Sequence, residues 1–295
     1  MLNTSRALVG LMALAASGLG GCSDSSGPTN DPLTAQNAQA VGAAAASTAD
    51  LALLAVNPSV PDFGGAFPLL FAAGRPLAHG LGFSPPASPP EGCPAASNLT
   101  DTDGDGVPDA ATWTFTAELC TETDIEGNRS VVTGSVGLSD PGLTAGYDLD
   151  LNSLTAAYFE NGATTPLAQL SMDGQWGLRG TSDALSLGQQ YKLAATVGNH
   201  TAVLTNSLDV GFDATGGAIA WGAPLPDGTL AIDGTWQVVA DNQSHRLMLA
   251  TLEPLVYDDA CGGFVGGVLQ AAGEGGEVTV TWTACGVHTS TFIAS

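Results

Sequence analysis

Apolar and polar residues alternate along most of the chain beyond residue 110. In the segment EVTVTWTA (277–284), Val278, Val280 and Trp282 share one parity and three threonines share the other. The segment TWTFTAEL (112–119) alternates in the same way, with Trp113 and Leu119 at the two ends of its apolar face. A period of two with threonine on one parity is typical of antiparallel strands that have one solvated face.

Eight further segments follow this pattern less strictly, and turn-forming groups such as Pro226-Asp227-Gly228 separate several of them. These segments are 131–136, 147–157, 169–178, 191–197, 202–212, 230–240, 247–252 and 264–269. Together with the first two, they predict roughly ten antiparallel strands within a β domain at 91–295.

The chain before residue 91 has a different pattern. Residues 34–56 are rich in alanine, contain no proline and end before Asn57-Pro58, which predicts a helix with Gly42 as its weakest point. The rest of 33–90 is a connector rich in proline and glycine, with a short helix expected only at 67–73. We therefore expect a mainly β fold, in which an antiparallel curled β-meander or half-barrel of roughly ten strands is covered by an N-terminal Ala-rich helix. This architecture resembles the half-barrel sheets over a helix of periplasmic lipoprotein carriers.

A weak internal repeat relates two of the expected strands. LSMDGQWGLRG (170–180) and LAIDGTWQVVA (230–240) align with an offset of 60 residues, and a glycine precedes a tryptophan by two positions in each. The period is too long and the copies are too few for a propeller or a solenoid, so we expect duplicated hairpins in one sheet. The inward-facing Gly174 and Gly234 would let a neighbouring side chain or a helix come close.

Residues 1–21 have the features of a secretory signal peptide, with Arg6 followed by an apolar run at 7–19 that is too short to span a membrane. The ending LGGC resembles the lipobox of bacterial lipoproteins, in which the cysteine, here Cys22, is lipidated and becomes the N-terminus. The resemblance implies a membrane anchor of acyl chains on Cys22, a flexible tether at 22–32 and a location in the bacterial cell envelope. Ser23 after the cysteine favours the outer membrane. An ordinary signal peptide with a chance cysteine is the alternative.

Export determines how the other four cysteines are interpreted. Cys93, Cys120, Cys261 and Cys285 are an even number in an oxidising compartment, which predicts two disulfides. Of the three pairings, we favour Cys93–Cys120 and Cys261–Cys285, because each closes a local loop around one strand pair. A zinc site is the rival interpretation, but the chain has no CxxC pair and no clustered histidines.

The chain is strongly acidic, with 29 Asp and Glu against 6 Lys and Arg and a net charge of −23. Such a surface repels nucleic acid and anionic lipid headgroups, so we expect no nucleic-acid partner. It attracts cations, although most single carboxylates need no role beyond solubility.

Four aspartates crowd into nine residues just before the strand at 112, in DTDGDGVPD (101–109). Without a cation, carboxylates this close would repel one another. Asp101, Asp103, Asp105 and Asp109 take positions 1, 3, 5 and 9 of an EF-hand-type loop. Glycine at position 6 permits the sharp turn that brings the Val107 carbonyl to the ion. The pattern predicts a Ca²⁺ site formed by these five residues; an Asp/Gly turn without an ion is the alternative.

Position 12 departs from the full loop, because Thr112 replaces the bidentate glutamate of a calcium sensor. The nine residues resemble instead the Asp-rich calcium loops of thrombospondin type 3 and dockerin modules, of which this chain has one copy. The resemblance implies calcium as a cofactor. Water, or one of Glu118, Glu122 and Asp124, would supply the missing ligand. Because the loop lies between two cysteines expected to pair, we interpret the site as structural.

The chain contains none of the common catalytic motifs, neither GxSxG, HExxH, a phosphate-binding loop nor GxGxxG. The histidines have no ligand spacing, and His245 is expected on the surface in a hairpin turn. Asp258-Asp259 is interpreted as a solvated turn, with a second cation site or a glycosidase carboxylate as alternatives. Four tryptophans occupy apolar-parity positions and are expected in the core, namely Trp113, Trp176, Trp236 and Trp282. Trp221 lies in a loop-like segment, where an exposed ring would suggest ligand contact.

Two functions remain open from the sequence. The first is a non-enzymatic envelope lipoprotein whose curled sheet is either packed solid or holds an apolar ligand, and which binds that ligand or another envelope component. The second is a secreted glycan-directed hydrolase, which would need two carboxyl groups about 5–9.5 Å apart in one cleft.

Overall fold

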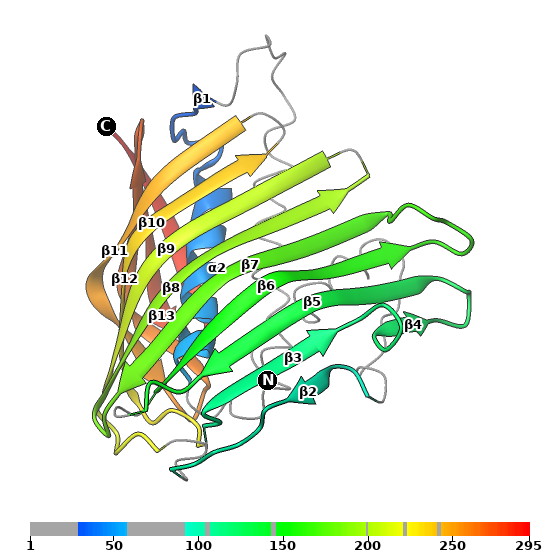
Figure 1. Ribbon diagram of the computed structural model, residues 1–295. Helices are drawn as coiled ribbons and strands as arrows, with labels where there is room; N and C mark the ends of the chain where they lie inside the picture. Colours follow the sequence, from blue (N-terminus) through cyan, green and yellow to red (C-terminus); the bar gives the residue numbers. More distant parts are fainter. Residues whose placement is uncertain are drawn as a thin grey trace.

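The structure is a computed structural model that describes residues 29–57, 92–103, 107–142, 146–198, 200–220, 223–240 and 243–295. These residues form one helix, α2 (Ala38–Val56), and a single sheet of fourteen strands (Figure 1). The strands are β1 (Thr29–Asn30), β2 (Ala95–Ser97), β3 (Ala110–Phe115), β4 (Thr121–Thr123), β5 (Arg129–Ser139), β6 (Gly146–Phe159), β7 (Ala168–Gly180), β8 (Ala184–Val197), β9 (His200–Ala214), β10 (Gly228–Ala240), β11 (Gln243–Asp258), β12 (Gly263–Gly273), β13 (Gly276–Ala284) and β14 (Val287–Ala294).

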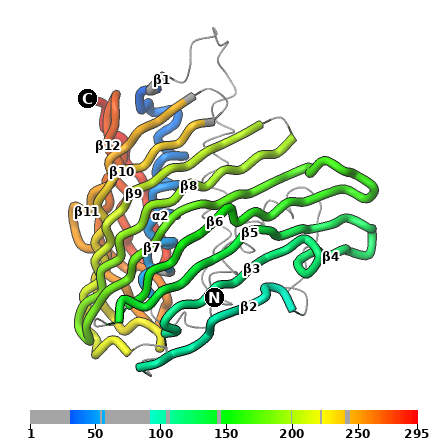
Figure 2. Tube along the Cα trace, in the orientation of Figure 1, coloured from blue at the N-terminus to red at the C-terminus, as the bar shows by residue number. Residues whose placement is uncertain are grey.

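The sheet is an antiparallel meander. Its order is β14-β13-β12-β11-β10-β9-β8-β7-β6-β5-β3-β2, while β4 pairs with β5 and β1 pairs in parallel with β11. Strands joined by short turns become neighbours, so sequence order and spatial order nearly coincide. The sheet curls, and α2 lies on its concave side beside the C-terminal strands (Figures 1 and 2). The mainly β fold, the curled antiparallel meander and the covering helix are therefore confirmed.

The number of strands was underestimated, because β1, β2, β4 and β14 do not stand out in the sequence pattern. The strand expected at 112–119 also ends early, at Phe115. The amides of Leu119 and Cys120 instead turn back to the carbonyl of Thr116, at 3.2 and 2.8 Å. As a result Leu119 is 40% exposed, and its expected place on the apolar face was wrong.

Helix α2 begins at Ala38, four residues later than expected, because the preceding turn caps it. The amide of Thr34 donates to Oδ1 of Asn37 at 2.8 Å, and the amide of Asn37 points back to Oγ1 of Thr34 at 3.4 Å. This reciprocal pair has the form of a capping box, with asparagine in place of glutamate or glutamine. It satisfies amides that the first helical turn leaves without partners.

The middle of α2 is buried on all sides. Every residue from Ala44 to Ala49 is buried, and six consecutive residues cover the whole circumference of a helix with 3.6 residues per turn. Thr48 satisfies its hydroxyl group by donating to the carbonyl of Ala44 at 2.9 Å. A helix with alanine on nearly every side allows close packing against the sheet, so α2 forms part of the core rather than an external cover.

At Gly42, α2 approaches the sheet closely. A Cβ atom at this position would lie 2.3 Å from Oγ and 2.7 Å from Cβ of Ser290 in β14. It would also lie 3.3 Å from Cγ1 of Val278 in β13. The residue expected to be the weak point of the helix is thus the one that lets the helix pack against the last two strands.

The two glycines of the repeat are equivalent in the structure as well. Gly174 and Gly234 have φ values of 156° and 149°, in the region that favours glycine. A Cβ atom would lie 2.3 Å from the carbonyl oxygen of Gln190 in the first case and 2.2 Å from that of Ser207 in the second. The hairpins β7–β8 and β10–β11 belong to one sheet, as expected. Side chains of the adjacent strand also come close, as expected: the same Cβ atom would lie 2.6 Å from Cβ of Tyr191 at Gly174 and 3.0 Å from Cδ2 of Leu208 at Gly234. No helix atom is among the nearest neighbours of either glycine.

Residues 29–33, at the end of the expected tether, lie against the sheet. The amide of Asp31 donates to the carbonyl of Ser244 at 2.6 Å, and Oδ2 of Asp31 accepts from the Ser244 amide at 3.0 Å. Leu33 is buried, and its amide donates to the carbonyl of Glu274 at 2.5 Å. Because β12 extends only to the level of Leu247, β1 and these contacts cover the first residues of β11.

Two disulfides join Cys93 to Cys120 and Cys261 to Cys285, with Cα–Cα distances of 5.2 and 6.0 Å. Both expected pairings are confirmed. Within the described ranges, no helix has the length and apolar character needed to cross a membrane. The signal peptide expected at 1–21, Cys22 and the short helix expected at 67–73 lie outside the described residues.

Candidate functional site

The predicted calcium loop connects β2 to β3. Asp101, Asp103, Val107 and Asp109 are described, whereas Asp105 lies outside the described residues together with the glycines beside it. Val107 is 4% exposed, so the end of the loop that returns to β3 is anchored in the core. The calcium site stays a prediction, and the described part of the loop shows how its two ends are held.

Asp109 closes the loop. Its amide donates to the carbonyl of Thr100 at 2.8 Å, and its carbonyl accepts from the amide of Asp140 at 3.1 Å. Its carboxylate accepts from Thr102 twice, at Oδ1 from the amide at 2.9 Å and at Oδ2 from the hydroxyl group. These bonds from Thr102 lower the pKa of Asp109. Each carboxylate oxygen still has a second lone pair, so Asp109 can brace the loop and also face a cation.

Asp124, one of the residues expected to complete the ion's shell, has another role. Its Oδ1 accepts from the amides of Glu126 and Asn128, both at 2.9 Å, and its Oδ2 accepts from Nδ2 of Asn128 at 3.0 Å. The bonds from Asn128 lower the pKa of Asp124. Asn161 then ties this turn to the turn after β6 by donating from Nδ2 to the carbonyl of Glu126 at 2.9 Å. Asp124 therefore stabilises the turn between β4 and β5, an Asx turn that the sequence analysis missed.

His245 does not lie on the surface, as the sequence analysis expected. It lies within β11, is 8% exposed and faces the same side of the sheet as Leu247. Its Nδ1 lies 3.0 Å from the carbonyl oxygen of Asp31. The hairpin turn was wrong because β11 begins at Gln243, and residues 29–33 cover the start of that strand. His79 lies outside the described residues.

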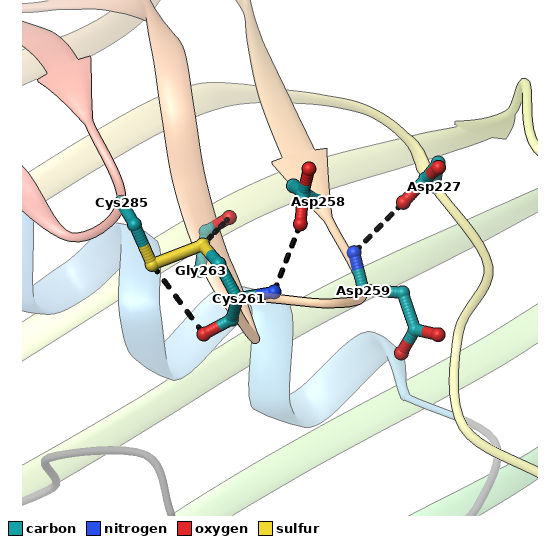
Figure 3. Close-up of a disulfide and its surroundings, with 6 residues drawn as sticks. All are labelled: Asp227, Asp258, Asp259, Cys261, Gly263 and Cys285. Carbon is teal, nitrogen blue, oxygen red and sulfur yellow. Dashed lines mark hydrogen bonds between the residues drawn. A yellow bond between two sulfur atoms is a disulfide. The ribbon is translucent and has the colours of Figure 1, made fainter.

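Asp258 and Asp259 form the turn beside the disulfide between Cys261 and Cys285 (Figure 3). Oδ1 of Asp258 accepts from the amide of Cys261 at 2.8 Å, and Oδ1 of Asp227 accepts from the amide of Asp259 at 2.8 Å. Desolvation, together with these three carboxylates, raises the pKa of Tyr257. These hydrogen bonds show that Asp258 and Asp227 stabilise the turn. In the described segments, no three His, Cys, Asp or Glu side chains are arranged to hold a metal ion.

The four tryptophans at apolar-parity positions are buried, as expected: Trp113 (8% exposed), Trp176 (7%), Trp236 (1%) and Trp282 (3%). Trp176 lies opposite Gln189, and Trp236 lies opposite Asn206, so each of these two rings has a buried amide as its cross-strand neighbour. Nε1 of both rings and Nδ2 of Asn206 are buried without a hydrogen-bond partner in the described part of the chain. Trp221 lies outside the described residues.

A hollow of about 490 Å³ lies on the outer face of β6 to β9, away from α2. Its walls are the outward-facing side chains of Asp148, Asp150, Gln175, Gln190, Ser207 and Asp209, and Gly177 and Gly188 lie opposite each other in its middle. Sequence reasoning missed this hollow, because it exists only through the register of four strands. A run of outward-facing aspartate, glutamine and glycine on consecutive strands is the signal that could have indicated it.

Asp148 and Asp150 are the carboxylates of the hollow that best match the spacing of a glycosidase pair. Residues two apart on one strand are about 7 Å apart at their Cα atoms. However, Nη2 of Arg179 donates to both carboxylate oxygens of Asp148 at 2.7 Å. Nη1 of Arg179 also donates to the carbonyls of Tyr147 and Leu178, which fixes the guanidinium group at the rim. Both carboxylate oxygens of Asp148 are thus engaged by Arg179.

No protein-family model matches the chain, and neither a curated protein nor a solved structure matches it significantly.

Proposed function

We propose that this protein is a non-enzymatic lipoprotein of the bacterial envelope, anchored through Cys22. Its β domain acts as a solid scaffold that presents a polar outer face to another envelope component. The observation that supports this most strongly is the burial of the middle of α2 on all sides, because the protein's own helix then fills the part of the concave face beside the C-terminal strands, where a carrier would hold lipid.

The outer face is the surface left for binding. It carries the hollow on β6 to β9, whose walls combine carboxylate acceptors with the amide groups of Gln175 and Gln190. With a net charge of −23, the protein repels anionic partners and favours neutral or cationic ones. A partner rich in hydroxyl or amino groups would match this set of acceptors.

We propose a structural role for calcium within this scaffold. Asp101, Asp103, Asp105, the carbonyl of Val107 and Asp109 would hold the ion, and the contacts of Asp109 with Thr102 would fix one side of the loop. Calcium takes six to eight oxygen ligands at about 2.3–2.6 Å, so water would fill the remaining positions. The ion would neutralise the crowded carboxylates and order the connection between β2 and β3.

The buried donors of Trp176, Trp236 and Asn206 favour a second candidate function. N–H groups of this kind normally find an acceptor when they are buried. An apolar ligand with a carbonyl or carboxylate head could supply acceptors at the inner face. The protein would then be a carrier of such a ligand, with α2 as a movable cover.

Native mass spectrometry of the protein extracted from bacterial membranes separates these functions. A scaffold should appear as the acylated chain, in one or two copies, with no apolar molecule bound, and Cys22→Ser should remove both the acyl mass and the membrane association. A stoichiometric apolar molecule that leaves on mild extraction would favour the carrier instead. Release of reducing sugar from envelope glycans, abolished by Asp150→Asn, would favour the hydrolase.

A further inference from the structure

The sheet ends in an unusually unprotected edge strand. β14 is eight residues long, and β13 is its neighbour on one side, while the described residues pair no strand with its other side. Edge strands are normally protected by shortness, charge, proline or a bulge. The opposite edge, β2, has only three residues. The sequence of β14, VHTSTFIA, contains no acid, lysine, arginine or proline, so it lacks protection by charge or proline. The pair of β13 and β14 has one register irregularity, between Trp282 and Ala284, and is regular from His288 to Ala294.

The distribution of charge isolates this edge from the rest of the protein. Outward-facing aspartates are spread over β6 to β10, at Asp148, Asp150, Asp173, Asp209 and Asp233. On β13, beside the edge, the sole acid is Glu277, and its Oε2 accepts from Nε2 of Gln270 at 2.6 Å. Two copies with a net charge of −23 repel each other over most of their surfaces. Along β14 itself the two copies bring no acidic side chain together, and the carboxylates of Asp258 and Asp259 lie at one end, in the turn beside the disulfide of Cys285 (Figure 3).

The side chains of β14 are also complementary to themselves. Thr289, Thr291 and Ile293 face outward opposite the outward-facing positions of β13, and Val287 shares their parity. Val287 and Ile293 are 55% and 54% exposed, more than Val256 of the interior strand β11 at 41%. In an antiparallel pair centred on Ser290, Val287 lies opposite the second copy's Ile293, and Thr289 lies opposite the second copy's Thr291. The pairing covers both exposed apolar side chains at once and matches threonine with threonine.

We infer that this chain forms a two-fold symmetric dimer in which the β14 strands of two copies pair antiparallel and join the two sheets into one. The interface is isologous, as is usual for homodimers, and its register is set by Ser290 on the two-fold axis. Main-chain hydrogen bonds provide the attraction, and the outward-facing side chains set the register. This inference goes beyond the proposed scaffold function and depends on neither the lipid anchor nor calcium.

Sedimentation velocity of residues 22–295 with Cys22→Ser, which keep every residue that the structure describes, tests the dimer. The unsubstituted protein should be dimeric at about 100 μM, well above the dissociation constants of ordinary protein interfaces. Thr289→Lys/Thr291→Lys should make it monomeric, because each copy then brings two ammonium groups opposite two others. Thr201→Lys/Thr205→Lys, on exposed positions of β9, is the matched control and should remain dimeric. An unsubstituted protein that is monomeric at this concentration overturns the inference.

A charge-swap experiment tests the register. Thr289→Asp/Thr291→Asp should also be monomeric alone, but mixing it with Thr289→Lys/Thr291→Lys should restore a dimer that contains one copy of each. Circular dichroism and the unfolding midpoint of each variant check that the substitutions leave the fold intact. A dimer that persists in both variants, or a mixture that stays monomeric, contradicts pairing through β14.

Discussion

Replacing Gly42 with alanine should destabilise the protein, although alanine is the better helix former. Alanine in a helix interior is more favourable than glycine by about 1 kcal/mol. The new Cβ atom, however, would lie 2.3 Å from Oγ and 2.7 Å from Cβ of Ser290. Inserting a carbon into a well-packed core costs about 1–3 kcal/mol. The net change in the free energy of unfolding should therefore be a loss of up to about 2 kcal/mol.

The same substitution should change sign when Ser290 is first replaced by glycine. Ser290→Gly removes both atoms that a methyl group on residue 42 would meet, and Cγ1 of Val278 at 3.3 Å is then the nearest neighbour. In that background, Gly42→Ala should stabilise the protein by up to about 1 kcal/mol. The coupling energy from the four variants should be about 1–3 kcal/mol, independent of what Ser290→Gly costs by itself.

Urea unfolding of the four proteins, followed by tryptophan fluorescence, measures this coupling. Because the helix and the strand are far apart in the sequence, a coupling between residues 42 and 290 reports their packing in the folded state. If Gly42→Ala stabilises the protein by about 1 kcal/mol in both backgrounds, α2 does not pack against β14 as described.

Three further outcomes are expected. Calcium at about 100 times its dissociation constant should stabilise the protein by about 2.7 kcal/mol. Differential scanning calorimetry should show that Asp103→Asn/Asp105→Asn removes this stabilisation, and stabilisation that persists in the variant would place the ion elsewhere. Gly234→Ala should lower the free energy of unfolding in urea by at least about 2 kcal/mol, because its Cβ atom would lie 2.2 Å from a backbone oxygen. Gly211→Ala, whose Cβ atom would have no neighbour within 4 Å, should be nearly neutral, and equal effects of the two substitutions would contradict this expectation. Burial raises the pKa of Tyr191 from 10.0 to about 12, so the stability that the neutral phenol contributes is complete below pH 10 and is lost as the pH rises towards 12. The Tyr191→Phe variant should therefore lose less stability than the unsubstituted protein between pH 9 and 11, and identical pH profiles would contradict this.

The alternation of apolar and polar residues predicted those strands in which every second side chain is buried. Val278, Val280 and Trp282 all face the core, because strict alternation leaves one arrangement that buries them. β14 escaped prediction for the opposite reason. Its apolar residues, Val287, Phe292 and Ile293, follow no single parity, because both faces of an edge strand are largely exposed. Helix α2 was predicted from composition, but its contact at Gly42 depends on residues nearly 250 positions away and could not be inferred locally.

In the candidate site, too, local features were predicted and features that depend on three-dimensional contacts were missed. The predicted calcium loop is contiguous, so spacing alone was enough to propose its ligands between Asp101 and Asp109, and the site stays a prediction. The engagement of Asp109 by Thr102 and of Asp124 by Asn128 depends on turn conformation, which the spacing did not reveal. His245 was misplaced because its partner, the carbonyl of Asp31, comes from a segment expected to be a free tether. A local sequence pattern does not reveal such contacts between segments that are far apart in the chain.

Hydrogen exchange across residues 38–56 determines whether α2 is a fixed part of the core. Peptides from this helix should exchange as slowly as peptides from β10 and β13, since a helix whose middle is buried on all sides opens only with the sheet. If α2 exchanges rapidly while those strands remain protected, the helix is a movable cover. The inner face of the sheet would then be open to a ligand, contrary to the solid scaffold proposed here.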